Sequence, residues 1–265
     1  MNEPLPLLAA KGISKRFGGV QALADVGFTI RHGEIYGLIG PNGAGKTSLF
    51  NVLTGIYVPD GGHFAFDGEV LQGLKPNEVA ARGIARTFQN IRLFANLSAL
   101  ENVMIGRHVR TRAGVWGAIS RNAHAREEER AIHQRAYELL EYVGVAKRAN
   151  SLARHLPYGD QRRLEIARAL ATEPKLLALD EPAAGMNATE TASLRGLLED
   201  IRRDGTTILL IEHDMKLVMS VCDRVLVLDY GKKIAEGTAG DVQSDPKVIA
   251  AYLGGEVSLN LKGTT

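Results

Sequence analysis

Short apolar runs alternate with amphipathic stretches along this chain of 265 residues. The runs that predict buried strands are at 35–39, 176–179, 206–211 and 225–228. The stretches with helical spacing of apolar positions are at 48–53, 162–171 and 188–203. Strands that alternate with helices indicate an α/β fold with a mainly parallel sheet, and ligands bind such sheets at the carboxyl ends of the strands.

Two regions depart from this alternation. Residues 5–35 and 59–68 hold short strand-like runs and turns, which predict an antiparallel β layer. Helical spacing in 100–105 and a charged amphipathic stretch over 125–143 predict an inserted helical subdomain. We expect Gly144 to end its long helix, and residues 111–120 to form a loop between helices.

The composition excludes several classes of protein. Lys and Arg outnumber Asp and Glu by only two (32 against 30), so charge gives no reason to expect a nucleic-acid partner. No apolar run approaches the ~18 residues of a membrane span, and the first residues do not resemble a signal peptide. The single cysteine, Cys222, has no partner for an internal disulfide. We expect a soluble cytoplasmic chain that reaches a membrane only through partners.

The segment 40–47, Gly-Pro-Asn-Gly-Ala-Gly-Lys-Thr, lies between a predicted strand and a predicted helix. Its glycines let backbone N–H groups line one concavity, and the helix that follows adds the positive end of its dipole. Lys46 is expected to contact the β- and γ-phosphates, and the Thr47 hydroxyl to ligate Mg²⁺. The predicted nucleotide-binding residues of this segment are Gly40, Pro41, Asn42, Gly43, Ala44, Gly45, Lys46, Thr47 and Ser48.

Polar residues at other strand ends complete a hydrolytic site. Asp180 follows a buried strand and could hold Mg²⁺ through water, while Glu181 is the candidate general base for an attacking water. His213 follows another strand and is expected to contact the γ-phosphate. Gln89 lies where the β-rich part meets the helical part, where its amide could ligate Mg²⁺ and respond to the γ-phosphate.

A second helix N-terminus could also bind phosphate. The segment Leu156–Gln161 leads directly into a strong helix, and Gly159 with the amides after it is exposed at its start. The candidate nucleotide-binding residues here are Tyr158, Gly159, Asp160 and Gln161. The chain has one lysine-bearing phosphate loop and one further helix end that could bind phosphate. We expect this combination if two subunits sandwich the nucleotide, each binding one side of it.

With these segments in view, the chain resembles an ABC transporter ATPase subunit over nearly its whole length. Segment 40–47 resembles the Walker A motif, Gln89 the Q-loop, and Leu156–Gln161 the signature motif. Leu176–Glu181 resembles Walker B with its catalytic glutamate, and His213 the switch histidine. The resemblance implies ATP and Mg²⁺ as ligands, and it implies that Phe17 stacks on adenine.

The resemblance also implies a P-loop NTPase of ABC type and a domain organisation. One nucleotide-binding domain would span 1–265. Its parts would be a RecA-like core with the β layer at 1–89 and 156–240, a helical subdomain at 90–155, and a C-terminal helix and tail at 241–265.

Longer segments resemble the branched-chain amino acid importers within this family. They lie at 86–94, 158–168, 180–187, 211–215 and 245–254. This resemblance implies a second ATPase subunit in a homo- or heterodimer, two membrane permease subunits and, indirectly, a periplasmic substrate-binding protein. It places the chain at the cytoplasmic face of the membrane. A urea or amide importer and a lipopolysaccharide exporter remain the nearest alternatives.

The chain departs from the general ABC pattern in two motifs. Pro157 and Tyr158 replace the Ser-Gly of Leu-Ser-Gly-Gly-Gln, and proline offers neither a hydroxyl nor an N–H to a phosphate. Asn187 replaces the D-loop aspartate. Phosphate contacts in trans are therefore expected from Gly159 and later amides.

Soluble ABC ATPases that act on DNA or ribosomes form a different class. The DNA-repair type needs a long coiled coil between the phosphate loop and the signature, whereas residues 47–156 show no sustained heptads. The translation type carries two cassettes in one chain, and this chain carries one.

Overall fold

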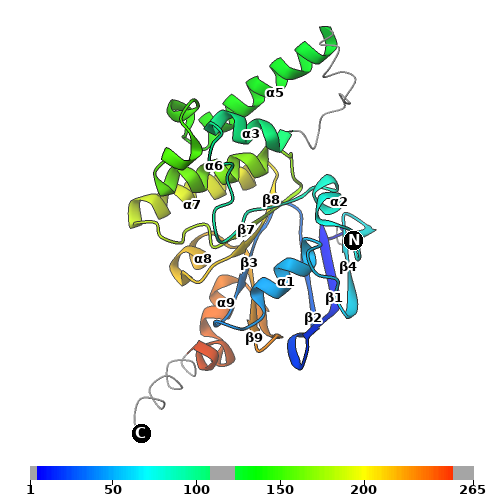
Figure 1. Ribbon diagram of the computed structural model, residues 1–265. Coiled ribbons are helices and arrows are strands. Elements are labelled where there is room, and N and C mark those ends of the chain that lie inside the picture. The colour runs from blue at the N-terminus through cyan, green and yellow to red at the C-terminus, as the bar shows by residue number, and fades with distance from the viewer. Residues whose placement is uncertain (1–4, 108–122, 253–265) are drawn as a thin grey trace. The chain divides into compact units, whose positions relative to one another are not determined.

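The computed structural model describes residues 5–107 and 123–252 (Figure 1). They fall into two units. Unit 1 comprises Met1–Val79 and Thr191–Thr265, and unit 2 comprises Ala80–Glu190. The loop expected at 111–120 lies outside the described residues.

A mainly parallel sheet forms the centre of unit 1. Its strands follow the order β10 (Lys232–Gly237), β9 (Arg224–Asp229), β3 (Ile35–Ile39) and β8 (Thr207–Ile211). β3 pairs in parallel with both β8 and β9, whereas β10 is an antiparallel edge. Every residue of β3 and β8 is buried, because apolar side chains cover both faces of a central parallel strand. The strands expected at 35–39, 206–211 and 225–228 are thus confirmed to within one residue.

The predicted β layer is the second sheet of unit 1. It has the order β2 (Val20–Ile30), β1 (Leu8–Phe17), β4 (Gly61–Phe66) and β5 (Glu69–Val70), and all its pairings are antiparallel. β1 and β2 are longer than the short runs expected, because register shifts along their ladder break the alternation of apolar and polar residues. A backbone hydrogen bond from Ala24 to Gly231 (2.8 Å) ties this sheet to the β9–β10 turn.

Short helices complete unit 1. They are α1 (Lys46–Leu53), α8 (Met215–Val221), α9 (Ala239–Ser244) and a last helical segment over residues 246–252. α2 (Pro76–Ala81) runs across the boundary between the units and was not expected from the pattern, since Val79 is its one buried residue.

Unit 2 combines two strands with packed helices. β6 (Ile84–Arg86) pairs in parallel with β7 (Leu176–Asp180). The helices α3 (Ala99–Arg107), α5 (Ala123–Tyr142) and α6 (Tyr158–Leu170) contact one another (Figure 1). Two short 3₁₀ turns, Ala146–Arg148 and Ala153–His155, lie between α5 and α6, and α7 (Ala188–Arg203) begins in unit 2 and continues into unit 1.

The helix ends of unit 2 follow local rules. Gly144, with φ of 80°, takes up the left-handed conformation that ends α5, as predicted. α6 begins at Tyr158 rather than at residue 162, because Pro157 takes the N-cap position and fixes the chain in an extended conformation before it.

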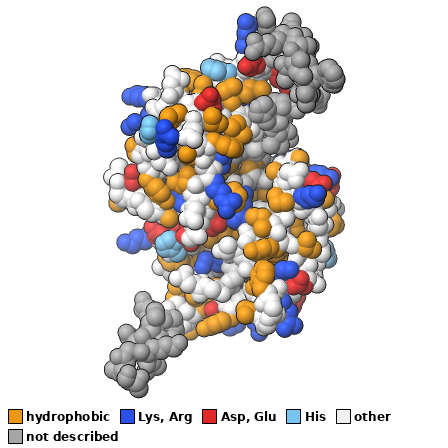
Figure 2. Space-filling model, in the orientation of Figure 1, with side chains coloured by type: hydrophobic (Ala, Val, Ile, Leu, Met, Phe, Trp, Pro, Cys, Tyr) orange, Lys and Arg blue, Asp and Glu red, His pale blue; other side chains and the backbone are white. Residues whose placement is uncertain are grey.

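The described surface is mixed in character. On the face drawn in Figure 2, acidic and basic side chains are interspersed with apolar ones, as a net charge of +2 suggests. None of the helices in the described ranges is both long and apolar enough to cross a bilayer.

Candidate active site

The phosphate loop of unit 1 depends on glycine for close packing. Gly40 has φ of 150°, and a Cβ there would lie 2.1 Å from the Leu228 carbonyl oxygen. Gly45 has φ of 100°, and its Cβ would lie 2.5 Å from the Ala22 carbonyl oxygen. Neither position tolerates a side chain, so the loop is fixed between the end of β9 and strand β2.

Lys46 lies over this loop. Its buried Nζ donates hydrogen bonds to the carbonyl oxygens of Gly40 (2.6 Å) and Pro41 (3.0 Å). Gly45 caps α1 without a side-chain hydrogen bond, and the first turn of α1 carries no acidic residue. A lysine ammonium and an open helix N-terminus at one loop form a site suited to a polyphosphate.

A hollow of about 260 Å³ runs along the loop. One wall is the loop itself, another is the turn after β9, and the third is the last helical segment. The lining residues are Pro41, Asn42, Gly43, Ala44, Asp229, Tyr230, Ala250 and Ala251.

His213 lies at the same sheet edge as the phosphate loop. Leu38 of β3 is in register with Ile211 of β8, so Gly40 and His213 each lie two residues beyond this pair, at the carboxyl ends of the two strands. The His213 side chain is 64% exposed, and its Nδ1 is 3.8 Å from a carboxylate oxygen of the buried Glu212. The imidazole is therefore accessible for the predicted contact with a γ-phosphate.

Phe17 ends β1 with its ring partly exposed. It packs edge-on against Tyr57, with the ring centroids 5.1 Å apart. The Lys15 ammonium also lies over this ring, 5.6 Å from its centroid, so the predicted stacking on adenine would use the other face.

Unit 2 brings two of its predicted residues into direct contact. Gln89 Nε2 donates a hydrogen bond of 2.9 Å to Glu181 Oε2. Glu181 has φ of 48°, a left-handed conformation that is uncommon for a residue with a side chain. The amide thus orients the carboxylate that we expect to act as general base.

Asp180, the residue before it, is buried. Its backbone N–H is 3.3 Å from Thr87 Oγ1, and its carboxylate is 3.6 Å from the Arg86 guanidinium. The predicted magnesium ligands Thr47, Gln89 and Asp180 all offer oxygen donors, which suit this ion. In the described parts of the chain no three His, Cys, Asp or Glu side chains are placed to hold a metal.

The signature segment is tied down within unit 2. The Tyr158 ring lies against Gly185, where a Cβ would be 3.2 Å from the ring, and its hydroxyl accepts hydrogen bonds from Arg162. Asp160 pairs with Arg148 at 2.9 Å. Gln161 Nε2 donates to the Leu156 carbonyl oxygen at 2.8 Å.

Asn187, one of the two departures from the ABC pattern, starts α7. Its Oδ1 accepts a hydrogen bond from the Glu190 N–H (3.0 Å), and its own N–H donates to the Glu190 carboxylate (2.9 Å). The two residues form a capping box, so the amide has a structural role at this helix end. Glu190 also lies beside Gly159, 3.1 Å from the place of a Cβ there.

The sequence interpretation missed two residues that hold the Gln89 loop. Arg162 and Glu165 are buried in α6 and hydrogen-bond the backbone of residues 88–92. The only signal in the sequence was an Arg and a Glu at i and i+3 of a helix, which ordinarily marks a solvated face.

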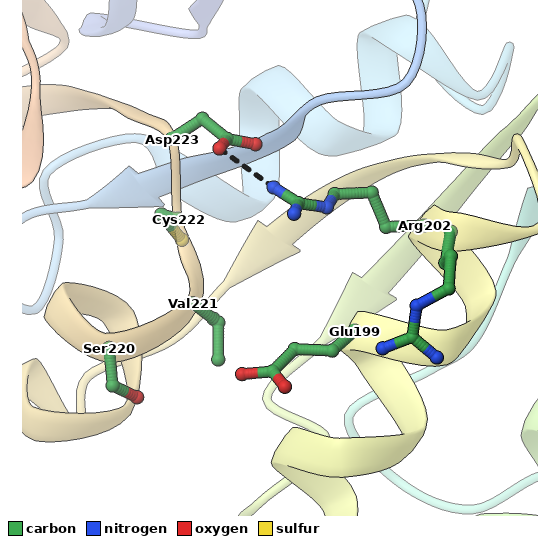
Figure 3. A pocket seen from close by; sticks show the side chains of 7 residues that line it. Glu199, Arg202, Ser220, Val221, Cys222 and Asp223 are labelled. Carbon is green, nitrogen blue, oxygen red and sulfur yellow. Dashed lines mark hydrogen bonds and ion pairs between the residues drawn. The ribbon is translucent and has the colours of Figure 1, made fainter.

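A further hollow of about 320 Å³ lies between α7 and α8, away from the predicted residues (Figure 3). An ion pair between Arg202 and Asp223 (2.8 Å) spans it. The other lining residues are Glu199, Arg203, Ser220, Val221 and Cys222.

The predicted residues divide between the units. The phosphate loop, Phe17 and His213 belong to unit 1, whereas Gln89, the signature segment, Asp180 and Glu181 belong to unit 2. Each unit thus carries part of the predicted site.

Comparison with known proteins identifies the family of the chain. The family described as "ABC transporter" matches residues 23–184, and the family described as "Branched-chain amino acid ATP-binding cassette transporter" matches residues 232–258. The chain is 46% identical over 250 residues to the high-affinity branched-chain amino acid transport ATP-binding protein LivG of Salmonella typhimurium, covering 94% of this chain and 98% of the relative. It is 34% identical over 252 residues to the lipopolysaccharide export system ATP-binding protein LptB of Escherichia coli, with 95% and 99% covered.

Solved structures agree with the sequence relatives. The ADP conformation of MJ1267, an ATP-binding cassette of an ABC transporter, is 31% identical, with a TM-score of 0.82 and 95% of this chain and 100% of that chain covered. The dimeric post-hydrolysis state of the cassette MJ0796, bound to ADP and Pi, is 25% identical, with a TM-score of 0.75 and 88% and 98% covered. The fold, the phosphate loop and these matches together show that the chain belongs to the ABC transporter family, as one of its nucleotide-binding, ATP-hydrolysing subunits.

Proposed function

We propose that the chain hydrolyses ATP to drive import of branched-chain or other hydrophobic amino acids across the cell membrane. The observation that carries the catalytic part is the hydrogen bond from Gln89 to Glu181, which orients a carboxylate next to the strand-end Asp180. The choice of substrate class is supported by the higher identity to a branched-chain amino acid transport subunit (46%) than to a lipopolysaccharide export subunit (34%). The C-terminal match over residues 232–258 favours the same class.

The chemistry divides among named side chains. Lys46 and the amides of the phosphate loop bind the β- and γ-phosphates, and Phe17 stacks on the adenine. Glu181 accepts a proton from the attacking water, which is held in line with the γ-phosphate. His213 contacts the γ-phosphate and stabilises the charge that develops there.

Magnesium belongs to this proposal. Thr47, Asp180 and Gln89 would hold it, directly or through water. When bound, Mg²⁺ neutralises phosphate charge as the bond to the γ-phosphate breaks.

A complete site requires a second cassette. Asp160 and Gln161 are engaged within their own unit, and Pro157 has no N–H. Gly159 and the amides after it therefore supply the contacts to nucleotide bound on the partner. Dimeric structures within the family support a closed pair, which would be either two copies of this chain or this chain with a related ATPase subunit.

The membrane partners would be two permease subunits at the cytoplasmic face, served by a periplasmic substrate-binding protein. We place the docking groove near residues 89–94 and along 97–104. Phe94 in this stretch is 49% exposed, and the Arg168 guanidinium lies over its ring. An exposed aromatic ring of this kind suits contact with an apolar surface of a partner. Movement of the Gln89 loop would then transmit the presence of γ-phosphate to the groove.

Uptake measurements test the substrate. In cells that lack this chain, uptake of labelled leucine, isoleucine and valine should fall to background and return when the gene is restored. Restoration with Lys46→Ala should fail, which ties uptake to nucleotide binding. Unchanged amino-acid uptake together with a loss of urea uptake, or with lipopolysaccharide retained inside the cell, would replace the proposed substrate by one of its two alternatives.

A further inference from the structure

A buried ion pair lies in the middle of α6. Arg162 and Glu165 are 3% and 2% exposed, with a guanidinium nitrogen 3.4 Å from a carboxylate oxygen. Burial raises the pKa of the Glu165 carboxyl, while the N–H of Arg92 and the charge of Arg162 act in the opposite direction. Burying two charges costs free energy that their attraction often does not recover, so the contacts they make need an explanation.

Both members of the pair form hydrogen bonds with the backbone of the Gln89 loop. Arg162 donates to the carbonyl oxygens of Phe88 (2.7 Å) and Gln89. Glu165 accepts hydrogen bonds from the N–H groups of Phe88 (3.4 Å) and Arg92 (3.3 Å). One helix therefore holds the loop by donors and acceptors on both sides of the predicted γ-phosphate sensor.

The side chain between these contacts is also fixed. The Phe88 ring has the Arg86 guanidinium 4.7 Å from its centroid and the Arg92 guanidinium 4.3 Å from it. Because all three residues belong to the segment 86–92, these cation–π contacts stiffen the loop itself.

Arg162 also contacts the signature segment. Its Nε and one terminal nitrogen lie 3.2 and 3.0 Å from the Tyr158 hydroxyl. The same guanidinium thus connects the carbonyl of Gln89 with the side chain of Tyr158. All these residues lie in unit 2, so the connection is internal to one unit.

We propose that Arg162 and Glu165 are positioning residues that couple the Gln89 loop to the signature segment. When the Gln89 side chain engages γ-phosphate in its own subunit, the rigid guanidinium carries the shift of the loop to Tyr158 and Gly159, which serve the nucleotide of the partner subunit. This inference rests on the proposed ATP-dependent function. It adds a link between the two half-sites that one chain contributes.

Amide hydrogen exchange on the full chain, with and without ATP and Mg²⁺, tests the link. In the wild type, ATP should slow exchange in residues 40–48, 86–92 and 157–161. Arg162→Lys keeps the charge but cannot reach three oxygens at once, because lysine has a single point of donation. We expect ATP still to protect 40–48 with its affinity within about twofold of wild type, while the response of 157–161 falls at least about fivefold, the lower end of typical coupling between sites.

Two further variants sharpen the result. Glu165→Gln keeps an acceptor for the Phe88 and Arg92 N–H groups but loses the charge that holds Arg162, so an intermediate response is expected. Arg163→Lys is the matched control, because Arg163 lies one residue along the same helix and donates instead to the Val143 carbonyl oxygen (2.7 Å). Its ATP response should match that of the wild type. In the assembled transporter, kcat should fall about tenfold for Arg162→Lys with KM for ATP unchanged, the pattern of a lost transition-state contribution.

The outcomes distinguish failure of the proposed coupling from failure of the proposed ATP-dependent function. A normal response of 157–161 in both Arg162→Lys and Glu165→Gln would overturn the proposal, as would a wild type in which ATP protects 40–48 without affecting 157–161. Equal loss of protection at 40–48 in Arg162→Lys would assign the residue to general stability and would also overturn the proposal. A wild-type chain that shows no protection at 40–48 would instead refute nucleotide binding itself.

Discussion

Glu181 has a backbone conformation that costs a residue with a side chain on the order of 1–3 kcal/mol. Its φ of 48° turns the chain sharply just after β7, and its carboxylate accepts a hydrogen bond from Gln89. Strain of this kind persists only where the surroundings impose it, and it concentrates at functional sites. At the scale of single residues, the structure thus fixes the carboxylate of the candidate base and the amide that orients it.

The role of Glu181 is tested by Glu181→Gln. The amide oxygen of glutamine can still accept the hydrogen bond from Gln89, so the geometry should survive while the basicity is lost. We expect ATP binding within about twofold of wild type and turnover lower by about 10²–10⁴-fold, the usual contribution of a general base. ATPase assays and equilibrium binding of a fluorescent ATP analogue measure the two quantities. Glu199→Gln, an exposed carboxylate on α7 paired with Arg195, is the control that should leave both unchanged, and near-normal turnover in Glu181→Gln would remove this residue from the base role.

Cys222 gives a prediction about pH. Burial raises the pKa of its thiol from an ordinary value of 9.0 to about 12. The folded state therefore retains the proton that the unfolded chain releases, so this thiol stabilises the fold fully below a pH of about 9 and loses its contribution as the pH rises toward about 12. Between about pH 8 and about pH 10, the free energy of unfolding in urea should fall more for the wild type than for Cys222→Ala. Equal losses in the two proteins would contradict a buried, protonated thiol.

At the scale of elements, the hydrophobic pattern predicted the bounds of a strand or helix correctly where a single clear signal was present. Strand β3 and helix α7 have the predicted bounds, because an uninterrupted apolar run and a clear helical period each leave one solution. Strand β6 was not predicted, because three residues are too few to show a period. The predicted strand at β1 was too short, because bulges break its alternation of apolar and polar residues.

Within the candidate site, the sequence predicted the residues that face a ligand better than those that support them. Residues such as Lys46 and Glu181 stand out because their chemistry suits phosphate and water and because they follow strands. Arg162 and Glu165 do not stand out, because their partners are backbone groups more than 70 residues away along the chain. Only the tertiary fold turns an ordinary helical ion pair into the support of a loop.

The capping box at the start of α7 is an element with a measurable contribution. Asn187→Ala removes the acceptor for the Glu190 N–H and should lower the free energy of unfolding by about 1 kcal/mol. Asn187→Asp restores the acceptor and the residue that is general in the family, so its stability should match that of the wild type. Urea unfolding of the three proteins compares them. If Asn187→Ala were as stable as the wild type, the hydrogen bonds of this cap would contribute nothing in solution.

At the scale of the whole molecule, the predicted phosphate contacts are divided between the two units of the chain. Unit 1 offers a lysine-bearing loop with an open helix N-terminus, and unit 2 offers a second helix N-terminus at Gly159. The side chains of Tyr158 and Asp160 are engaged by Arg162 and Arg148, so we expect a ligand from outside to contact Gly159 and the amides after it. A symmetric pair of cassettes would give each nucleotide one loop and one signature segment.

Mixing two inactive variants tests this arrangement. Lys46→Ala should abolish nucleotide binding at its own loop but leave its signature segment intact. Gly159→Glu places a carboxylate at the start of α6, beside Glu190, and should repel phosphate while leaving its own loop intact. If two copies of this chain pair, each mixed dimer contains one intact composite site, and an equal mixture should recover up to about a quarter of wild-type ATPase activity from closed two-fold pairing. Each variant measured alone is the control, and circular dichroism confirms that both are folded. No recovery from two folded variants would show that the site is not shared between copies of this chain, and would direct the search to a different second ATPase subunit.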